Sequence, residues 1–247
     1  MEERTDLAYP PGTGALLANR GEPRPFPGNG VHAPRQVLLA ALWSQVREGR
    51  LALSEHFVSE RASFAVLHER SEADAAEHRF TPAQVEIFQR LVAGERQNAL
   101  AIDLALSPAA VTFRAQRCVQ LLGLDCRLSG LPLFLVIAAL SAAPPDDGPS
   151  PMATVEAIPG GDANAALYRV ARVDLVLPAT LTGAEQEVAR MVVEGQSPTA
   201  IANARQTTER TAANQLRAAF GKLGVTGRLE LIARLAGARP LAPRNAP

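Results

Sequence analysis

Apolar residues recur at helical spacing near the start of the chain, in the segment PRQVLLAALWSQVREG (34–49). One face of a helix through this segment carries Val37, Leu38, Ala41, Leu42 and Val46. A spacing of three to four residues predicts an amphipathic helix that turns one side toward a core. We expect this helix to lead the fold, with Trp43 as a core residue.

Two pairs of short apolar runs predict β-hairpins instead. LALSEHF (51–57) and SFAVLHE (63–69) flank a polar turn at 59–61. MATVEAI (152–158) and AALYRVARV (165–173) flank Pro159–Asp162, a Pro-Gly-Gly-Asp turn. Short runs on either side of such turns are typical of antiparallel strand pairs.

Helical spacing returns after each hairpin. In the second cluster, Thr182 and Glu185 have the spacing of a capping box, and Pro198 suits the first position of a second helix. Thr208 would cap a third helix, and a fourth runs from Arg228. Across these helices the predicted inner positions are Val188, Met191, Val192, Ile201, Ala202, Ala212, Leu216, Ala219, Phe220, Leu223, Leu231 and Leu235.

The chain repeats itself at an offset of 101 residues. The segment from Phe80 aligns without a gap with the segment from Leu181, and the hairpins follow the same offset. Matching pairs include Thr81 and Thr182, Glu86 and Glu187, Val92 and Val193, Gly94 and Gly195, and Leu122 and Leu223. A period of this length indicates a duplicated domain rather than a solenoid repeat.

These patterns predict a mainly α fold with small β-hairpins (α+β), built from tandem units of lead helix, hairpin and four-helix cluster. The predicted parts are a disordered Pro/Gly-rich arm (1–33), unit 1 (34–140, with hairpin 51–69 and helices 80–140), a linker (141–151), unit 2 (152–237, with hairpin 152–173 and helices 181–236) and a flexible tail (238–247).

Composition narrows the function classes. The chain has 25 basic and 25 acidic residues, which argues mildly against a generic polyanion binder but allows a local basic patch. The most apolar run, LPLFLVIAALSA (131–142), is too short to span a membrane, so we expect a buried fourth helix of unit 1 there, between the units. The N-terminus has no apolar targeting segment.

No motif for catalysis or metal binding is visible. The four histidines lie outside the helical clusters, and no nucleophile elbow, phosphate loop or metal-ligand spacing occurs. Cys118 and Cys126 align with Ala219 and Gly227, so the repeat needs neither thiol. We expect a cytoplasmic protein that is not an enzyme, with no cofactor and no metal.

The second cluster, LTGAEQEV…EGQSPTAIA…TERTAANQL…KLGVTGRLEL, resembles the LuxR-type (GerE) helix-turn-helix domain of bacterial transcription regulators. The first cluster resembles it more weakly. The resemblance implies that the third helix lies in the major groove of DNA. It places Ala213, Asn214 and Arg217 at base edges and Thr211 and Lys222 at phosphates. Arginine suits guanine and asparagine suits adenine, and Arg210 and Arg228 are candidate neighbours of the DNA backbone.

Departures from the family pattern raise an alternative. Ala212 stands where the family usually has a bulky aliphatic residue of the core, and Ala213 stands where it has a polar or basic residue that contacts bases. In unit 1, Ala110 replaces the threonine that matches Thr211, and Leu121 replaces the lysine that matches Lys222. Its reader positions are Thr112, Phe113 and Gln116, and its basic groups in this region are Arg114, Arg117 and Arg127. We retain Arg114 and Arg117 as candidate DNA contacts. A helix that faces a protein partner would also have this composition.

Two functions therefore compete. The leading hypothesis is a transcription regulator that reads double-stranded DNA mainly with unit 2, as a homodimer or as an intramolecular pseudo-dimer. It would act on RNA polymerase or on another regulator, without a membrane. The alternative is an interaction or dimerisation module of degenerate helix-turn-helix domains that modulates another regulator without reading DNA.

Overall fold

The computed structural model describes residues 35–59, 62–142, 152–158, 164–171 and 175–237. The expected arm, nearly all of the expected linker, the turn 159–162 and the tail lie outside them. The strands are β1 (Arg35–Leu38), β2 (Leu51–Val58), β3 (Ala62–Glu69), β4 (Met152–Ala157) and β5 (Ala165–Ala171). The helices are α1 (Leu39–Arg47), α2 (Glu72–His78), α3 (Pro82–Val92), α4 (Gln97–Asp103), α5 (Pro108–Leu121), the 3-10 helix η1 (Leu128–Gly130), α6 (Leu133–Leu140), α7 (Gly183–Val193), α8 (Pro198–Ala204), α9 (Glu209–Leu223) and α10 (Arg228–Leu235).

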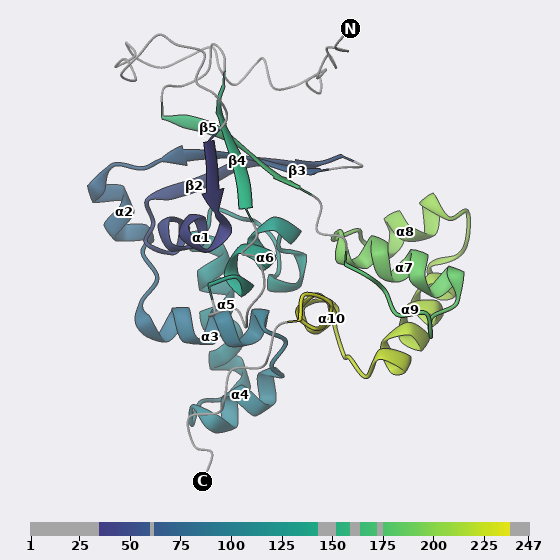
Figure 1. Ribbon diagram of the computed structural model, residues 1–247. Coiled ribbons are helices and arrows are strands. Elements are labelled where there is room, and N and C mark those ends of the chain that lie inside the picture. The colour runs from purple at the N-terminus through teal and green to yellow at the C-terminus, as the bar shows by residue number, and fades with distance from the viewer. Residues whose placement is uncertain (1–34, 60–61, 143–151, 159–163, 172–174, 238–247) are drawn as a thin grey trace, which may run out of the picture.

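All five strands form one antiparallel sheet in the order β1-β4-β5-β3-β2 (Figure 1). Both predicted hairpins are confirmed as strand pairs, β2 with β3 and β4 with β5. The hairpins join through β3 and β5, where Val66 lies opposite Leu167. The described fold is therefore α+β, as the patterns predict, but its two hairpins share one sheet.

The prediction of a helix over all of 34–49 is wrong at its start. Residues 35–38 form β1, which pairs with β4 so that Leu38 lies opposite Met152. The helical periodicity carries no information about this distant partner, whose backbone hydrogen bonds override the local preference. The face of α1 also differs from the prediction, because Leu39, Leu42, Trp43 and Val46 are buried and Ala41 is exposed.

Helices α1 and α6 pack under the sheet and carry much of the core (Figure 1). Trp43 is fully buried, as predicted, and stacks on Phe88 with ring centroids 5.1 Å apart. Phe80 meets Trp43 edge-on at 6.0 Å. Such aromatic contacts add to the free energy gained by burial alone, so α1 and α3 are held together at this cluster.

The apolar run forms α6 and is buried, as predicted. Residues 134–139 are all buried, and the helix contacts α1, α3 and α10. Its position in the sequence differs from the expectation for the fourth helix of unit 1. Helix α10 begins at Arg228, so its counterpart should begin at Arg127, whereas α6 begins at Leu133. Arg127 directly precedes the short helix η1, which begins at Leu128, and Pro132 precedes α6.

Helix α2 is an element that the sequence patterns did not predict. The hydroxyl of Ser71 accepts a hydrogen bond from the backbone N–H of Asp74, which caps this helix. Only Ala75 is buried within it. A helix with one buried residue has no apolar stripe, so its cap was the sole local signal.

The clusters α3–α5 and α7–α9 share their backbone conformation. Their helices begin at positions 101 residues apart. The predicted capping box of Thr182 and Glu185 is present, and Thr81 and Gln84 form the same motif at the start of α3. Left-handed residues also fall in matching pairs: Gly94 and Gly195 (φ 88° each), Ala105 and Gln206 (φ 52° and 51°), and Gly123 and Gly224 (φ 78° and 63°).

Helix α10 lies between the two clusters and contacts α3, α6 and α7 (Figure 1). Gly94, at the end of α3, approaches α10 so closely that a Cβ there would lie 2.8 Å from the Cα of Glu230. Glycine is therefore needed at this position both for its left-handed φ and for the packing of α10.

Arg228, the first residue of α10, joins the C-terminal cluster to the rest of the molecule. Its guanidinium is buried and donates to the carbonyls of Val192 and Val193 at the end of α7, each at 2.8 Å. Nη1 donates to the carbonyls of Ser129 and Leu131, at 2.9 and 2.8 Å. Burial lowers the pKa of Arg228 to about 10, so it remains charged at neutral pH.

Arg228→Ala should therefore destabilise the protein strongly. The substitution leaves the four carbonyls without this donor, and we expect the free energy of unfolding to fall by about 3 kcal/mol. Urea denaturation followed by circular dichroism measures the change. Arg210→Ala is the matched control, because Arg210 is exposed and a surface substitution shifts stability by less than about 0.5 kcal/mol. Equal effects of the two substitutions would contradict the role of Arg228.

Candidate nucleic-acid interface

Helix α9 presents one buried and one exposed face. Ala212, Ala219 and Leu223 are buried, and Leu216 and Phe220 pack partly buried against the same core, as predicted. The hydroxyl of Thr208 accepts a hydrogen bond from the N–H of Thr211 at 3.1 Å and caps the helix. The other side of α9 is thus free to meet a partner.

The exposed face collects most of the predicted DNA contacts. Arg210, Thr211, Ala213, Asn214 and Arg217 are all exposed on α9. Nη1 of Arg217 donates to Oδ1 of Asn214 at 2.9 Å. This bond links the two side chains that can form bidentate hydrogen bonds with base edges, and it restrains the direction of the arginine.

Lys222 lies near the end of α9, beside the start of α7. Its Nζ donates to Oε2 of Glu185 at 2.7 Å, while the lysine side chain stays 42% exposed. The same carboxylate accepts from the N–H of Thr182 in the capping box. These bonds, that from Lys222 first, lower the pKa of Glu185. Lys222 is therefore a positioned cation with one side open.

Further polar contacts, which the sequence patterns did not reveal, hold α9 against α7 and α8. Nε of Arg205 donates to Glu187 at 3.0 Å, and Nη1 donates to the side chain of Gln215. The hydroxyl of Thr199 donates to Glu209 at 2.6 Å. The left-handed backbone of Gln206 turns the chain between α8 and α9. These contacts fix the angle between the two helices of the helix-turn-helix.

Arg228 does not join this face, contrary to the expectation that it lies beside the DNA backbone. Only 8% of the residue is exposed, and its donors are directed at backbone carbonyls. The sequence shows a cation at the start of a helix. It does not show the carbonyls from a segment almost 100 residues away that enclose the side chain.

The corresponding face of α5 has a different chemistry. Phe113 is 74% exposed, Arg117 is exposed and Arg114 is half-buried. Thr112 donates to the carbonyl of Pro108, and Gln116 donates to the carbonyl of Cys126. Two of the three expected reader positions are thus engaged with the protein's own backbone.

The first cluster also contains a buried ion-pair network that the second lacks. Arg90 donates to Glu95 and to Asp103, each at 2.6 Å, and is only 2% exposed. These bonds, with that to Glu95 foremost, raise the pKa of Arg90 against the effect of burial. Met191 occupies the matching place in the second cluster. The network ties α3 to the start and end of α4.

Over the described ranges, no group of three His, Cys, Asp or Glu side chains is arranged to hold a metal ion. His56 lies opposite Ala65, and His68 lies opposite Ala52, so the two imidazoles are not paired across the hairpin. None of the described helices is long and apolar enough to cross a membrane.

Because of the ion pair between Glu185 and Lys222, we expect part of the protein's stability to be lost at acidic pH. Because the pKa of Glu185 is lowered in the folded state, its stabilisation is present above its ordinary pKa of 4.5 and is lost as the pH falls through the lowered value. Glu185→Gln keeps an acceptor for the capping box, as Gln84 does in α3, but removes the charge. We expect the gap in Tm between the parent and this variant to narrow from about pH 5 to pH 3. A gap that is independent of pH would contradict the assignment.

Comparison with known families places the C-terminal cluster. Residues 179–235 match the GerE family, described as bacterial regulatory proteins, luxR family. The match covers α7 to α10 and includes the whole exposed face of α9. Comparisons with curated proteins and with solved structures gave no match. Residues 179–235 are therefore a LuxR-family helix-turn-helix domain, which suggests regulation through DNA.

Proposed function

We propose that this protein is a bacterial, cytoplasmic transcription regulator that reads the major groove of DNA with α9. The observation that carries the proposal is the exposed pair Asn214 and Arg217 on the third helix of a LuxR-family domain. Their partners in the structure are each other, at 2.9 Å. Both side chains can exchange that bond for bonds to bases.

The surrounding residues suit the phosphates. Thr211 offers a hydroxyl at the start of α9, and Arg210 and Lys222 offer cations near its two ends. Such contacts fix the position of a protein on the duplex, whereas contacts to base edges supply specificity. Ala213 contributes only a methyl group. The reading surface therefore rests on two side chains, supported by a few phosphate contacts.

The two halves of the chain are, in this proposal, copies of one unit. The matching helix starts and left-handed residues support it. The sheet adds a further argument, because Val66 pairs with Leu167, which is 101 residues later. Antiparallel pairing of equal positions is what a two-fold axis between two copies produces. The chain would then form a pseudo-dimer within itself.

The copies are unequal as readers. Arg114 and Arg117 are the cations that α5 offers beside Phe113, so we assign α5 at most a contact with the DNA backbone. Because a single helix-turn-helix makes few contacts, an asymmetric site of two unequal halves would serve the pseudo-dimer. A homodimer of the whole chain is the other arrangement, and RNA polymerase or another regulator is the expected downstream partner.

Arg217→Ala should weaken binding to a selected site by about 1–3 kcal/mol and relax the preference at one base pair. The measurement is fluorescence anisotropy on a duplex selected from a random library, with a repeat selection for the variant. Arg190→Ala serves as the control, since Arg190 is exposed on α7. An unchanged selected sequence would remove Arg217 from the reading surface.

Lys222→Ala should weaken binding to all duplexes alike. Loss of one phosphate contact reduces the slope of log affinity against log salt by about 0.9. Titrations at several salt concentrations with the selected duplex and with a random one measure both effects. If the parent protein shows no salt-dependent binding to any duplex, the DNA-binding proposal fails as a whole.

A second candidate function, the interaction module, is favoured by one specific observation. Phe113 and Ile102 are 74% and 83% exposed, and both lie in the first helix-turn-helix. In the second cluster the matching residues are Asn214 and Asn203. Exposed apolar side chains in place of polar ones favour contact with a protein rather than with DNA.

Phe113→Ser tests self-association through this face. We expect the dimer dissociation constant from analytical ultracentrifugation to rise at least about tenfold, because burial of a phenylalanine contributes about 1.5–3 kcal/mol. Val176→Ser is the control, since Val176 is 81% exposed outside the cluster. A parent protein that stays monomeric at every concentration would rule out this mode of association.

A further inference from the structure

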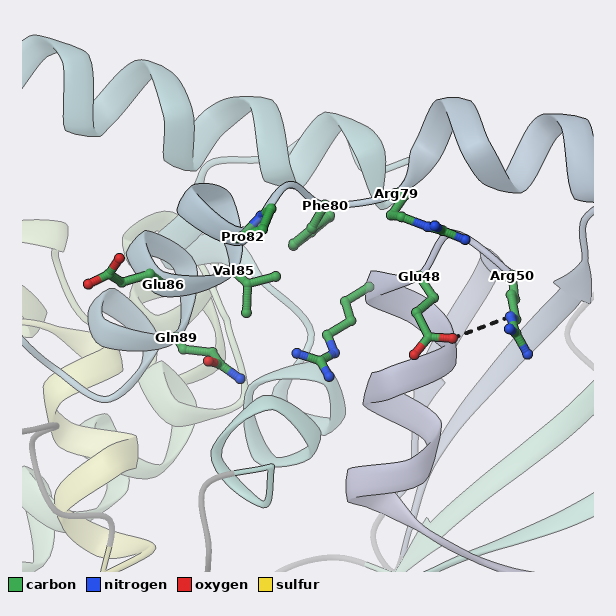
Figure 2. Close-up of a pocket in the computed structure, with 9 residues that line it drawn as sticks. Glu48, Arg50, Arg79, Phe80, Pro82, Val85, Glu86 and Gln89 are labelled. Atoms are coloured by element: carbon green, nitrogen blue, oxygen red, sulfur yellow. Dashed lines mark ion pairs between the residues drawn. The ribbon is translucent and has the colours of Figure 1, made fainter.

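A cleft of about 840 Å³ lies between the end of α1 and the start of α3, far in sequence from the DNA-reading helix. Figure 2 shows Arg79 and Arg50 at one end of it and Glu86 and Gln89 at the other, with Phe80 and Val85 between them. The volume is in the range of pockets that hold small molecules. Its lining combines charged ends with an apolar middle.

The cleft has an excess of positive charge. Three arginines line it, Arg47, Arg50 and Arg79, against two glutamates. Both glutamates are engaged, because Glu48 pairs with Arg50 at 3.3 Å (Figure 2) and Glu86 lies 3.8 Å from Nη1 of the buried Arg90. Neither Arg47 nor Arg79 has a hydrogen bond or ion pair from its side chain to any other described residue. Two guanidinium groups are thus left to bind an anion.

The apolar middle of the cleft is backed by packed aromatic rings. Phe80 is 5% exposed, and its ring contacts Trp43 and Phe88 at 6.0 and 5.6 Å. Pro82 and Val85 continue this wall along α3. An apolar group placed here would lose contact with water against a surface that is already packed from behind.

The second half of the chain has no arginine at the positions that match those of the cleft. At the matching positions 101 residues later, Arg47, Arg50 and Arg79 are replaced by Gly148, Pro151 and Thr180, while Phe80 becomes Leu181. The second half thus keeps an apolar residue, Leu181, at the position of Phe80, but it has no cation at the three positions of the arginines. The positive charge of the cleft is therefore specific to the first half of the chain.

We propose that the cleft binds a small organic anion. A carboxylate or phosphate group would be held by Arg79 at the end of the cleft that it shares with Arg50 (Figure 2), because the forked donors of an arginine match the two oxygens of such groups. The apolar body of the ligand would lie on Phe80 and Val85. The amide of Gln89 would hydrogen-bond to a polar group at the far end. The assignment is independent of whether α9 reads DNA.

Trp43 supplies a direct reporter, because it is the single tryptophan of the chain and contacts the cleft residue Phe80. The probes are phenyl phosphate and benzoate, titrated into the full chain with tryptophan fluorescence and calorimetry as readouts. We expect saturable binding of one or both, and the stronger of the two identifies the preferred head group. Inorganic phosphate, which lacks the apolar body, and benzyl alcohol, which lacks the charge, should each bind at least about tenfold more weakly, since each loses one of the two contacts.

Arg79→Ala should lower the affinity for the probe at least about tenfold, and Arg190→Ala on α7 should leave this affinity unchanged. Because Arg79 is exposed, the variant should keep the parent's Tm, which circular dichroism checks. Chemical-shift changes at the side-chain amide of Gln89 give a second test of the location.

Three results would overturn the proposal. One is the absence of saturable binding for both probes, and another is equal affinity of the parent and Arg79→Ala. The third is displacement of the probe by random duplex together with a reduced salt slope in Arg79→Ala. That result would make the cleft part of a DNA surface.

Discussion

The buried guanidinium of Arg228 determines how the helix-turn-helix meets the rest of the molecule. A buried charge is tolerated only when its hydrogen bonds are satisfied, and here every acceptor is a backbone carbonyl from two separate segments. The carbonyl of Val193 would otherwise be an orphan acceptor of a helix terminus, whereas that of Val192 also accepts from the N–H of Gly195. One side chain thus caps α7, holds the loop before α6 and sets the start of α10. The orientation of α9 follows, because α9 packs on α7.

The sheet imposes a second constraint on the two halves. β1 comes from the start of the described chain yet pairs with β4, and β3 pairs with β5. Each half therefore supplies hydrogen-bonding partners to the other, and the halves cannot separate without exposing those backbone groups. The sheet therefore joins the two halves of the described chain through backbone hydrogen bonds.

The local features of this fold were predictable because their signals are local. Capping residues, left-handed glycines and the inner face of α9 depend on residues within a few positions of one another. The strand β1, the burial of Arg228 and the network around Arg90 depend on partners that are distant in sequence or on the packing of side chains. The cleft at Arg79 belongs to the same class, because residues of α1 and α3 form it jointly. The spacing of apolar residues predicts which face of a helix is buried, but it does not predict which distant segment packs against that face.

The difference between the two third helices lies in where their polar side chains are used. On α5, Thr112 and Gln116 bind backbone carbonyls of their own cluster, and Phe113 between them is apolar. On α9, Asn214 and Arg217 bind only each other on an exposed face. A side chain that already serves its own fold must break that bond to contact a base, and the cost reduces the affinity gained. Asn214 and Arg217 would give up only the solvent-exposed hydrogen bond between them in order to contact bases, and this costs little free energy. In the function that we propose, the same scaffold thus favours DNA reading at α9 and disfavours it at α5, even though the two backbones match.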